Sequence, residues 1–142
     1  MIQVRKINNM VDMEAAWAIR KKVFVEEQQC PEDEEYEYEE ESTHFLALVN
    51  GTVAGTARWR KTDKGIKLER FAVLPEFRKK GVASALLETI LDDALREHPE
   101  KIYLHAQVQA MPLYEKFSFV KHGELFYEAS IPHYAMTYEK SN

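Results

Sequence analysis

The sequence predicts a mixed α/β fold, in which helices flank a central, mostly antiparallel sheet. Three segments of strand length follow one another between residues 44 and 73, and hairpin signals at Asn50-Gly51 and 62–65 separate them. Two longer segments, 10–28 and 81–97, carry apolar residues at three- and four-residue spacing, which is typical of amphipathic helices. The second helix lies between two predicted strands and therefore forms a right-handed βαβ crossover, so those two strands can run parallel.

The predicted elements follow one another along the chain without a linker or an internal repeat. Asn8 and Asn9 are candidate caps for the first helix, and Pro31 closes it. Pro75 ends the third strand of the meander, because proline cannot donate to a sheet ladder. In chain order we expect a strand from Ile2, a helix over 10–28, strands over 44–49, 52–61 and 66–73, a helix over 81–97, a strand over 102–106, a helix over 110–117, a strand from Phe119 and a strand over 132–138.

Length and composition predict a single domain over residues 1–142. Hydrophobic residues make up 45% and charged residues 30%, a globular balance without an apolar run long enough to span a membrane. The first residues lack the apolar stretch of a signal peptide, so we expect a cytoplasmic protein. The net charge of −5 disfavours nucleic acid as a partner, because phosphate binding needs a basic surface. Cys30 is the only cysteine and is expected to be structural.

The segment 32–41 is acidic at every position except Tyr36 and Tyr38. Such a run is typical of a solvated loop, which is the interpretation we favour. It is also compatible with a negative lip that attracts a cationic amine, or with a contact in a homodimer.

The segment 78–84 joins a predicted strand to the long helix. The first turn of a helix leaves backbone N–H groups without partners, and the helix dipole adds partial positive charge there, so this turn suits a phosphate. Gly81 lets backbone and ligand approach closely, and Val82, Ala83 and Ser84 follow it. The cations Arg78, Lys79 and Lys80 precede it. The alternative is an ordinary glycine near a helix start, beside a basic cluster that serves solubility.

The run from Arg78 to Ala83 resembles the R/Q-x-x-G-x-G/A signature of the GCN5-related N-acetyltransferases. The resemblance covers nearly the whole chain in the order and length of the elements. It implies that the amides of this loop hold the pyrophosphate of acetyl-CoA, which is a cosubstrate in this family. It also implies that the preceding strand, with Phe71, Ala72 and Val73, lies beside the pantetheine arm. Segments 23–31 and 131–133 resemble those of a bacterial subfamily of uncharacterised small acetyltransferases, and we expect them to shape the acceptor pocket.

A second signature of that family is matched by Gln107, Ala110 and Tyr114, at spacings of three and four residues. The resemblance implies that Tyr114 is the general acid that protonates the coenzyme A thiolate, and that Gln107 contacts the pantetheine or a bridging water. Ser118 stands where the family usually has glycine, at the exit of the predicted helix. The alternative for Tyr114 is a core tyrosine whose hydroxyl is satisfied.

The general base is expected among three residues. Strict alternation along 66–73 places Glu69 on the face opposite Leu68, together with Phe71 and Val73, and apolar neighbours would raise the pKa of its carboxyl. The alternatives are a structural glutamate and loss of the amine proton to water. His44 and His133 each begin a predicted strand and are candidates for the acceptor pocket. No spacing of histidine, cysteine and carboxylate residues suggests a metal site.

Together these features predict an acetyl-CoA-dependent N-acetyltransferase. It would move the acetyl group directly to a primary amine of a small molecule or a peptide. The alternative is a module that binds or senses acyl-CoA without turnover, which would not need a proton donor at Tyr114.

Overall fold

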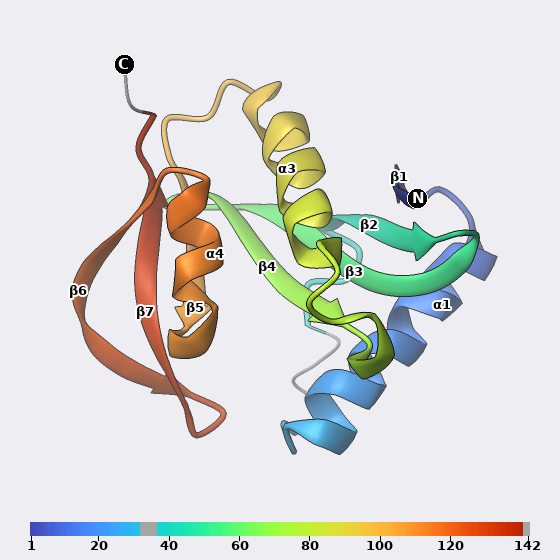
Figure 1. Cartoon of the computed structure of the whole chain (residues 1–142). Helices are drawn as coiled ribbons and strands as arrows, with labels where there is room; N and C mark the ends of the chain where they lie inside the picture. Colours follow the sequence, from blue (N-terminus) through green and yellow to red (C-terminus); the bar gives the residue numbers. More distant parts are fainter. Residues whose placement is uncertain (32–36, 141–142) are drawn as a thin grey trace.

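Seven strands form one sheet in the computed structural model, which describes residues 1–31 and 37–140. Their order is β1-β2-β3-β4-β5-β7-β6, and every neighbouring pair is antiparallel except β4 and β5 (Figure 1). The mixed, mostly antiparallel sheet of the sequence prediction is therefore confirmed. The strands are β1 (Ile2–Lys6), β2 (Ser42–Val49), β3 (Thr52–Thr62), β4 (Gly65–Val73), β5 (Ile102–Gln107), β6 (Phe119–Glu128) and β7 (Ile131–Tyr138).

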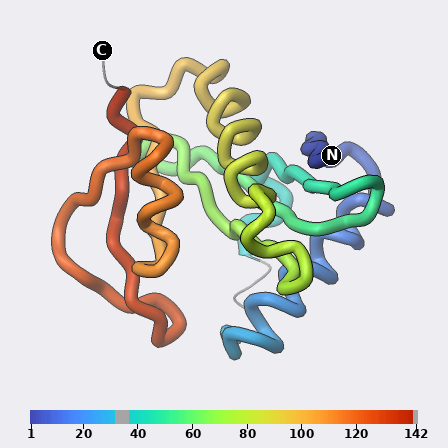
Figure 2. The backbone as a smooth tube through the Cα atoms, in the orientation of Figure 1, coloured from blue at the N-terminus to red at the C-terminus, as the bar shows by residue number. Residues whose placement is uncertain are grey.

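Helices cover both faces of this sheet. The predicted first helix has two parts, since α1 (Met10–Arg20) continues as a π-helical segment, η1 (Lys21–Glu27). The Asn9 side chain caps α1 by accepting a hydrogen bond from the Asp12 amide, as predicted. The opposite face carries the crossover helix α3 and the short helix α4 (Figure 2). These elements, with two 3-10 turns, are α3 (Val82–Leu95), α4 (Met111–Lys116), η2 (Pro75–Phe77) and η3 (Val108–Ala110).

Alternate residues of the central strands supply a hydrophobic cluster on each face. On β2, Phe45 and Ala47 pack in the cluster under α3, whereas Leu46 and Leu48 pack in the cluster under α1. A strand that is buried on both faces reads as a continuous apolar run, which explains the composition of this segment. Burial on both faces fixes the position of α1 and α3 relative to the sheet.

A β-bulge interrupts the alternation of β4. The register pairs Thr56 with Ala72 but Arg58 with Glu69, so two residues of β4 oppose one residue of β3. Arg70, one of those two, has a φ of 59°. The extra residue returns Phe71 to the α3 face, where Leu68 also lies. The predicted placement of Glu69 on the same face as Phe71 and Val73 is therefore wrong, because strict alternation assumes no bulge.

The parallel pairing of β4 with β5 is short. Only Ile66, Lys67 and Leu68 pair with Ile102, Tyr103 and Leu104. Beyond these residues the two strands separate, and Figure 1 shows them diverging between α3 and α4. The remaining halves of β4 and β5 are thus free to line a cleft.

Gly55 permits the close approach of α3 to the sheet beside this cleft. A Cβ atom at Gly55 would lie 2.9 Å from the Ala72 carbonyl oxygen and 3.1 Å from Cγ1 of Val82. The carbonyl belongs to β4 and Val82 to the first turn of α3, so neither can move alone.

Replacing Gly55 with alanine should therefore lower the free energy of unfolding by about 1–3 kcal/mol, through overpacking. Urea unfolding measures this change. Lys61→Ala, at the exposed end of the same strand, is the control and should stay within about 0.5 kcal/mol of the parent. A Gly55→Ala protein as stable as the parent would show that α3 is not held at this distance.

Candidate active site

A cavity of about 230 Å³ lies where β4 and β5 separate. The structure brings seven of the predicted site residues to its wall: Glu69, Phe71, Val73, Ala83, Gln107, Tyr114 and His133. Phe24 and Gln28, from the segment 23–31 that was expected to shape the acceptor pocket, also line this cavity. Further lining residues, which were not predicted, come from β4, β5 and β6 and include Lys67, Arg70, His105 and Glu128. Gln107 on β5 donates to the Gln28 side chain at 3.1 Å, so an amide pair joins the two sides of this cavity.

A second cavity, of about 210 Å³, lies at the start of α3. It shares Val73 and Ala83 with the first cavity, so the two are neighbours. Gly81 is the N-cap of α3 with a φ of 89°, a conformation that favours glycine. The first hydrogen bond of the helix runs from the Ala85 amide to the Gly81 carbonyl. The three amides between them have no intrahelical acceptor, as expected for an anion site.

The basic residues before Gly81 behave differently from one another. Arg78 lines the second cavity, and its guanidinium forms two hydrogen bonds to Glu27, at 2.6 and 2.7 Å, and one to the Val73 carbonyl. The hydrogen bond from Arg78 lowers the pKa of the Glu27 carboxyl. Arg78 therefore joins η1 to the loop at the wall of this cavity. Lys79 lines the second cavity, whereas Lys80 lies over the Phe77 ring at 5.9 Å.

Ala72, which was expected to contact the cofactor, has its side chain on the α1 face of β4. Its side chain is buried in the cluster under α1 and does not line either cavity. The bulge at Arg70 explains this, since it turns Phe71 and Val73 to the α3 face and Ala72 away from it.

Tyr114 is buried on α4 at the wall of the first cavity, with 7% of its surface exposed. The Tyr114 ring makes edge-to-face contacts with the rings of Phe71 and Phe119, at centroid distances of 5.7 and 6.2 Å. Burial raises the pKa of the Tyr114 hydroxyl well above its usual value. The hydroxyl therefore carries its proton at neutral pH, at the wall of the cavity, although the raised pKa makes it a weaker acid than a free phenol.

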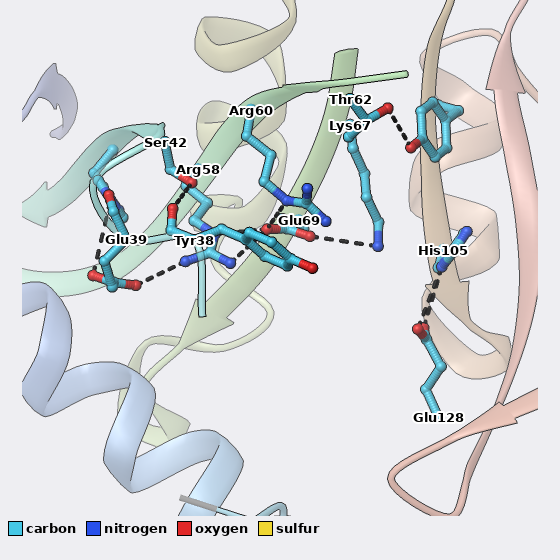
Figure 3. Close-up of polar contacts among 12 residues, drawn as sticks. Tyr38, Glu39, Ser42, Arg58, Arg60, Thr62, Lys67, Glu69, His105 and Glu128 are labelled. Carbon is cyan, nitrogen blue, oxygen red and sulfur yellow. Dashed lines mark hydrogen bonds and ion pairs between the residues drawn. The ribbon is translucent and has the colours of Figure 1, made fainter. Parts of the chain in front are cut away.

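Glu69 lies among cations on the α1 side of β4 (Figure 3). It accepts hydrogen bonds from Nε of Arg58 at 2.7 Å and Nε of Arg60 at 3.0 Å, and Lys67 Nζ is 3.4 Å away. Burial acts to raise the pKa of Glu69, but the charges of Arg58, Lys67, Arg60 and Arg70 outweigh it and lower the pKa to about 2. The expected raised pKa is wrong, because the bulge gives this carboxylate charged neighbours. Glu69 is thus a weak proton acceptor.

Glu39 extends this ion network toward α1. Its Oε1 atom accepts hydrogen bonds from Arg58 at 2.7 Å and Arg20 at 2.5 Å, and its Oε2 atom accepts one from Trp17 at 2.7 Å. This residue of the acidic run 32–41 therefore points inward and does not form a solvated loop or a lip. Residues 32–36 of the run lie outside the described part of the chain.

His44 belongs to the same region and does not line the first cavity. Its Nε2 atom lies 3.0 Å from the Glu39 backbone oxygen, and the ring is 8% exposed. Burial lowers the pKa of His44. The structure therefore does not bring this histidine to the first cavity with the other predicted site residues, because β2 directs its side chain toward Glu39.

A group of titratable residues lies on the opposite wall. Glu128 contacts His105 Nδ1 at 3.3 Å, and its Oε1 atom is 3.9 Å from His133 Nε2. His105 and Glu128 were missed by the sequence reasoning, since one sits within an apolar run and the other ends a strand whose extent was not predicted. Among the described residues, no group of three or more histidine, cysteine or carboxylate side chains has the arrangement of a metal site.

Comparison with known proteins agrees with this geometry. The family model described as an acetyltransferase (GNAT) domain matches residues 9–140. The chain belongs to the GNAT acetyltransferase family. It is 35% identical to the uncharacterised N-acetyltransferase YjcF of Bacillus subtilis over 130 residues, which are 90% of this chain and 93% of that protein. This GNAT chain is thus similar to an uncharacterised bacterial acetyltransferase, as the sequence indicated.

Two solved structures of the GNAT type have the same fold. The crystal structure of ElaA from Escherichia coli superposes with a TM-score of 0.84, at 25% identity, and covers 98% of this chain and 100% of that one. A GNAT family acetyltransferase from Elizabethkingia anophelis with acetyl-CoA bound gives a TM-score of 0.76, at 14% identity, with 98% of both chains covered. In residues 1–31 and 37–140 of this GNAT protein, no helix combines the length and the apolar character that crossing a bilayer requires.

The ion pairs of Glu69 predict a defined pH dependence of stability. The folded pKa of about 2 is lower than the ordinary value of 4.5, so the stabilisation is present above pH 4.5 and is lost as the pH falls toward 2. Glu69→Gln should lower the free energy of unfolding by about 3 kcal/mol at pH 7, because buried Arg58 loses a charged partner. Denaturant unfolding at several pH values should show the difference shrinking below pH 4.5.

The control is Glu97→Gln, which removes an exposed ion pair with Lys61 and should change stability little at any pH. A gap between parent and Glu69→Gln that stays constant down to pH 3 would contradict the assignment.

Proposed function

We propose that this GNAT protein is an acetyl-CoA-dependent N-acetyltransferase that acetylates a primary amine by direct transfer. The observation that carries the proposal is that the two cavities share the wall residues Val73 and Ala83. This shared wall places the amides at the start of α3 next to the cavity that contains the protonated hydroxyl of Tyr114. The presence of acetyl-CoA in the Elizabethkingia anophelis neighbour supports the choice of donor.

Donor binding would use the start of α3 and the outer half of β4. The pyrophosphate would lie on the amides of Val82, Ala83 and Ser84, with Lys79 beside it. The pantetheine arm would follow Phe71 and Val73 into the gap between β4 and β5, with Gln107 on its far side. The bulge at Arg70 leaves backbone groups outside the regular ladder at the point where the thioester would arrive.

The chemistry needs one proton at the leaving group and a neutral nucleophile. The amine nitrogen attacks the carbonyl carbon, the new C–N bond forms and the C–S bond breaks. The thiolate then takes the proton of Tyr114, and the proton that the nitrogen loses as the amide forms restores the Tyr114 hydroxyl. Glu69 would serve as an ionised partner that fixes Lys67 at the cleft wall and would not accept the amine proton itself.

Tyr114→Phe removes the proposed proton donor and keeps the ring. It should lower kcat by about 100-fold or more, because general acid catalysis contributes that much or more. Release of the coenzyme A thiol, measured across a panel of primary amines, is the readout.

Tyr103→Phe is the matched control, since that hydroxyl bonds Thr62 at 2.8 Å and lies outside the first cavity. Equal kcat values for Tyr114→Phe and parent would refute the role of Tyr114. If no amine is turned over while acetyl-CoA still raises the melting temperature, the protein is an acyl-CoA-binding module.

The pyrophosphate site can be tested without an acceptor. Gly81 and Gly51 have similar φ values, 89° and 84°, so replacement by leucine should strain the backbone to a similar degree at either position. Only Gly81→Leu should abolish the rise in melting temperature that coenzyme A gives, whereas Gly51→Leu should keep it. Loss of the shift in both variants, or in neither, would place the pyrophosphate elsewhere.

A further inference from the structure

His133 has a fixed ring orientation at the wall of the first cavity. Its Nδ1 atom lies 2.7 Å from the Ile131 carbonyl oxygen. A carbonyl oxygen can only accept a hydrogen bond, so Nδ1 carries the proton and Nε2 of the neutral ring carries the lone pair. The ring also stacks on Phe126, with centroids 5.9 Å apart. Nε2 of the buried His133 ring therefore points away from the Ile131 backbone and toward Glu128.

Glu128 offers a negative charge beside that nitrogen. The hydrogen bond from His105 lowers the pKa of the Glu128 carboxyl, so the carboxylate is ionised. Its Oε1 atom is 3.9 Å from His133 Nε2, which is too long for a hydrogen bond between them. A single ammonium nitrogen can donate to both atoms at about 2.9 Å, because two acceptors at this separation are within reach of one donor.

Among the charged groups that line this cavity, Glu128 is the one suited to bind an ammonium. Glu69, the second carboxylate on the cavity wall, is shared among Arg58, Arg60 and Lys67. The cations Lys67 and Arg70 line the β4 wall, and Lys67 lies between Glu69 and Glu128 in Figure 3. Gln28 and Gln107 are neutral and bond to each other. An ammonium group would therefore be attracted to the wall formed by β5, β6 and β7.

We infer that Glu128 and His133 form the acceptor site, where the Glu128 carboxylate holds the acceptor ammonium and His133 Nε2 takes its proton. The inference rests on the proposed acetyl transfer and assigns the acceptor class as primary alkylamines, which are protonated at neutral pH. His105 positions the Glu128 carboxylate, and Phe126 packs between the two imidazole rings, with centroids 5.0 and 5.9 Å away.

His133, Tyr114 and solvent together account for every proton in the reaction. The ammonium gives one proton to His133 Nε2 and becomes a neutral amine. That amine attacks the thioester carbon and loses a second proton when the amide forms, while the thiolate gains the proton of Tyr114. The second proton restores Tyr114, and His133 releases its own to solvent, so each turnover yields one acetylated amine, one thiol and one proton.

The kinetic experiment compares the parent with His133→Gln and Glu128→Gln. The substrates are the primary alkylamine that the parent acetylates best and its β,β-difluoro analogue, which is largely deprotonated at the assay pH. His133→Gln should lower kcat for the alkylamine by about 100-fold, with little change in KM, and far less for the fluorinated amine. Glu128→Gln should raise the KM of the alkylamine about tenfold. His122→Gln, on the exposed part of β6, is the matched control and should behave as the parent.

Equal losses for both amines in His133→Gln would overturn the proton transfer and leave a structural role. Full activity of His133→Gln, in a parent that acetylates amines, would refute the inference while the proposed function stands. If the parent acetylates no amine, the proposed function fails, and the ammonium site is then tested by binding alone.

Addition of n-butylammonium chloride to the protein with coenzyme A should shift the His133 Nε2 resonance in nitrogen NMR. n-Butanol should not shift it, and neither should the ammonium salt in Glu128→Gln; any other pattern overturns the site.

Discussion

The cleft of this protein depends on the early end of the pairing between β4 and β5. Three residues of each strand pair, and the strands then separate because the bulge at Arg70 bends β4 and redirects its side chains. The bulge turns Phe71 toward Tyr114 and leaves Glu69 on the α1 face with Arg58. The close approach of α3 at Gly55 then holds the free amides of the helix start at the edge of the same opening.

Charge is divided between the two walls of that cleft. On the β4 side, Glu69 and Glu39 are each shared among several cations, and Arg58 connects them. Carboxylates bound in this way stay ionised and are poor proton acceptors. On the other wall, Glu128 has only imidazole neighbours within ion-pair distance among the described residues, so it is the carboxylate suited to an incoming ammonium. The same residue type thus has different roles, which its neighbours determine.

Much of this architecture could be predicted from the sequence, because its signals are local. The spacing of apolar residues predicted the helices, Asn50-Gly51 predicted a hairpin, and Gly81 with its flanking residues predicted the loop at the start of α3. The unexpected surroundings of Glu69, Ala72 and His44 have a different origin. A bulge has no local signature in residues 66–73, and the partners of Arg58, Glu69 and Glu39, are 11 and 19 residues away. His44 contacts the Glu39 backbone only five residues away, but the inward turn of the acidic run that brings them together has no sequence signal. Glu128 and His105 come together only because β6, β7 and β5 are neighbours in the sheet.

A crystal structure with acetyl-CoA would test most directly the claim that the separated strands and the start of α3 form one donor site. We predict that the pyrophosphate lies on the amides of Val82, Ala83 and Ser84, and that the sulfur atom lies within hydrogen-bonding distance of the Tyr114 hydroxyl. The thioester would then stand between β4 and β5, facing His133. A pyrophosphate bound away from α3, or a sulfur atom outside the gap between β4 and β5, would contradict the account.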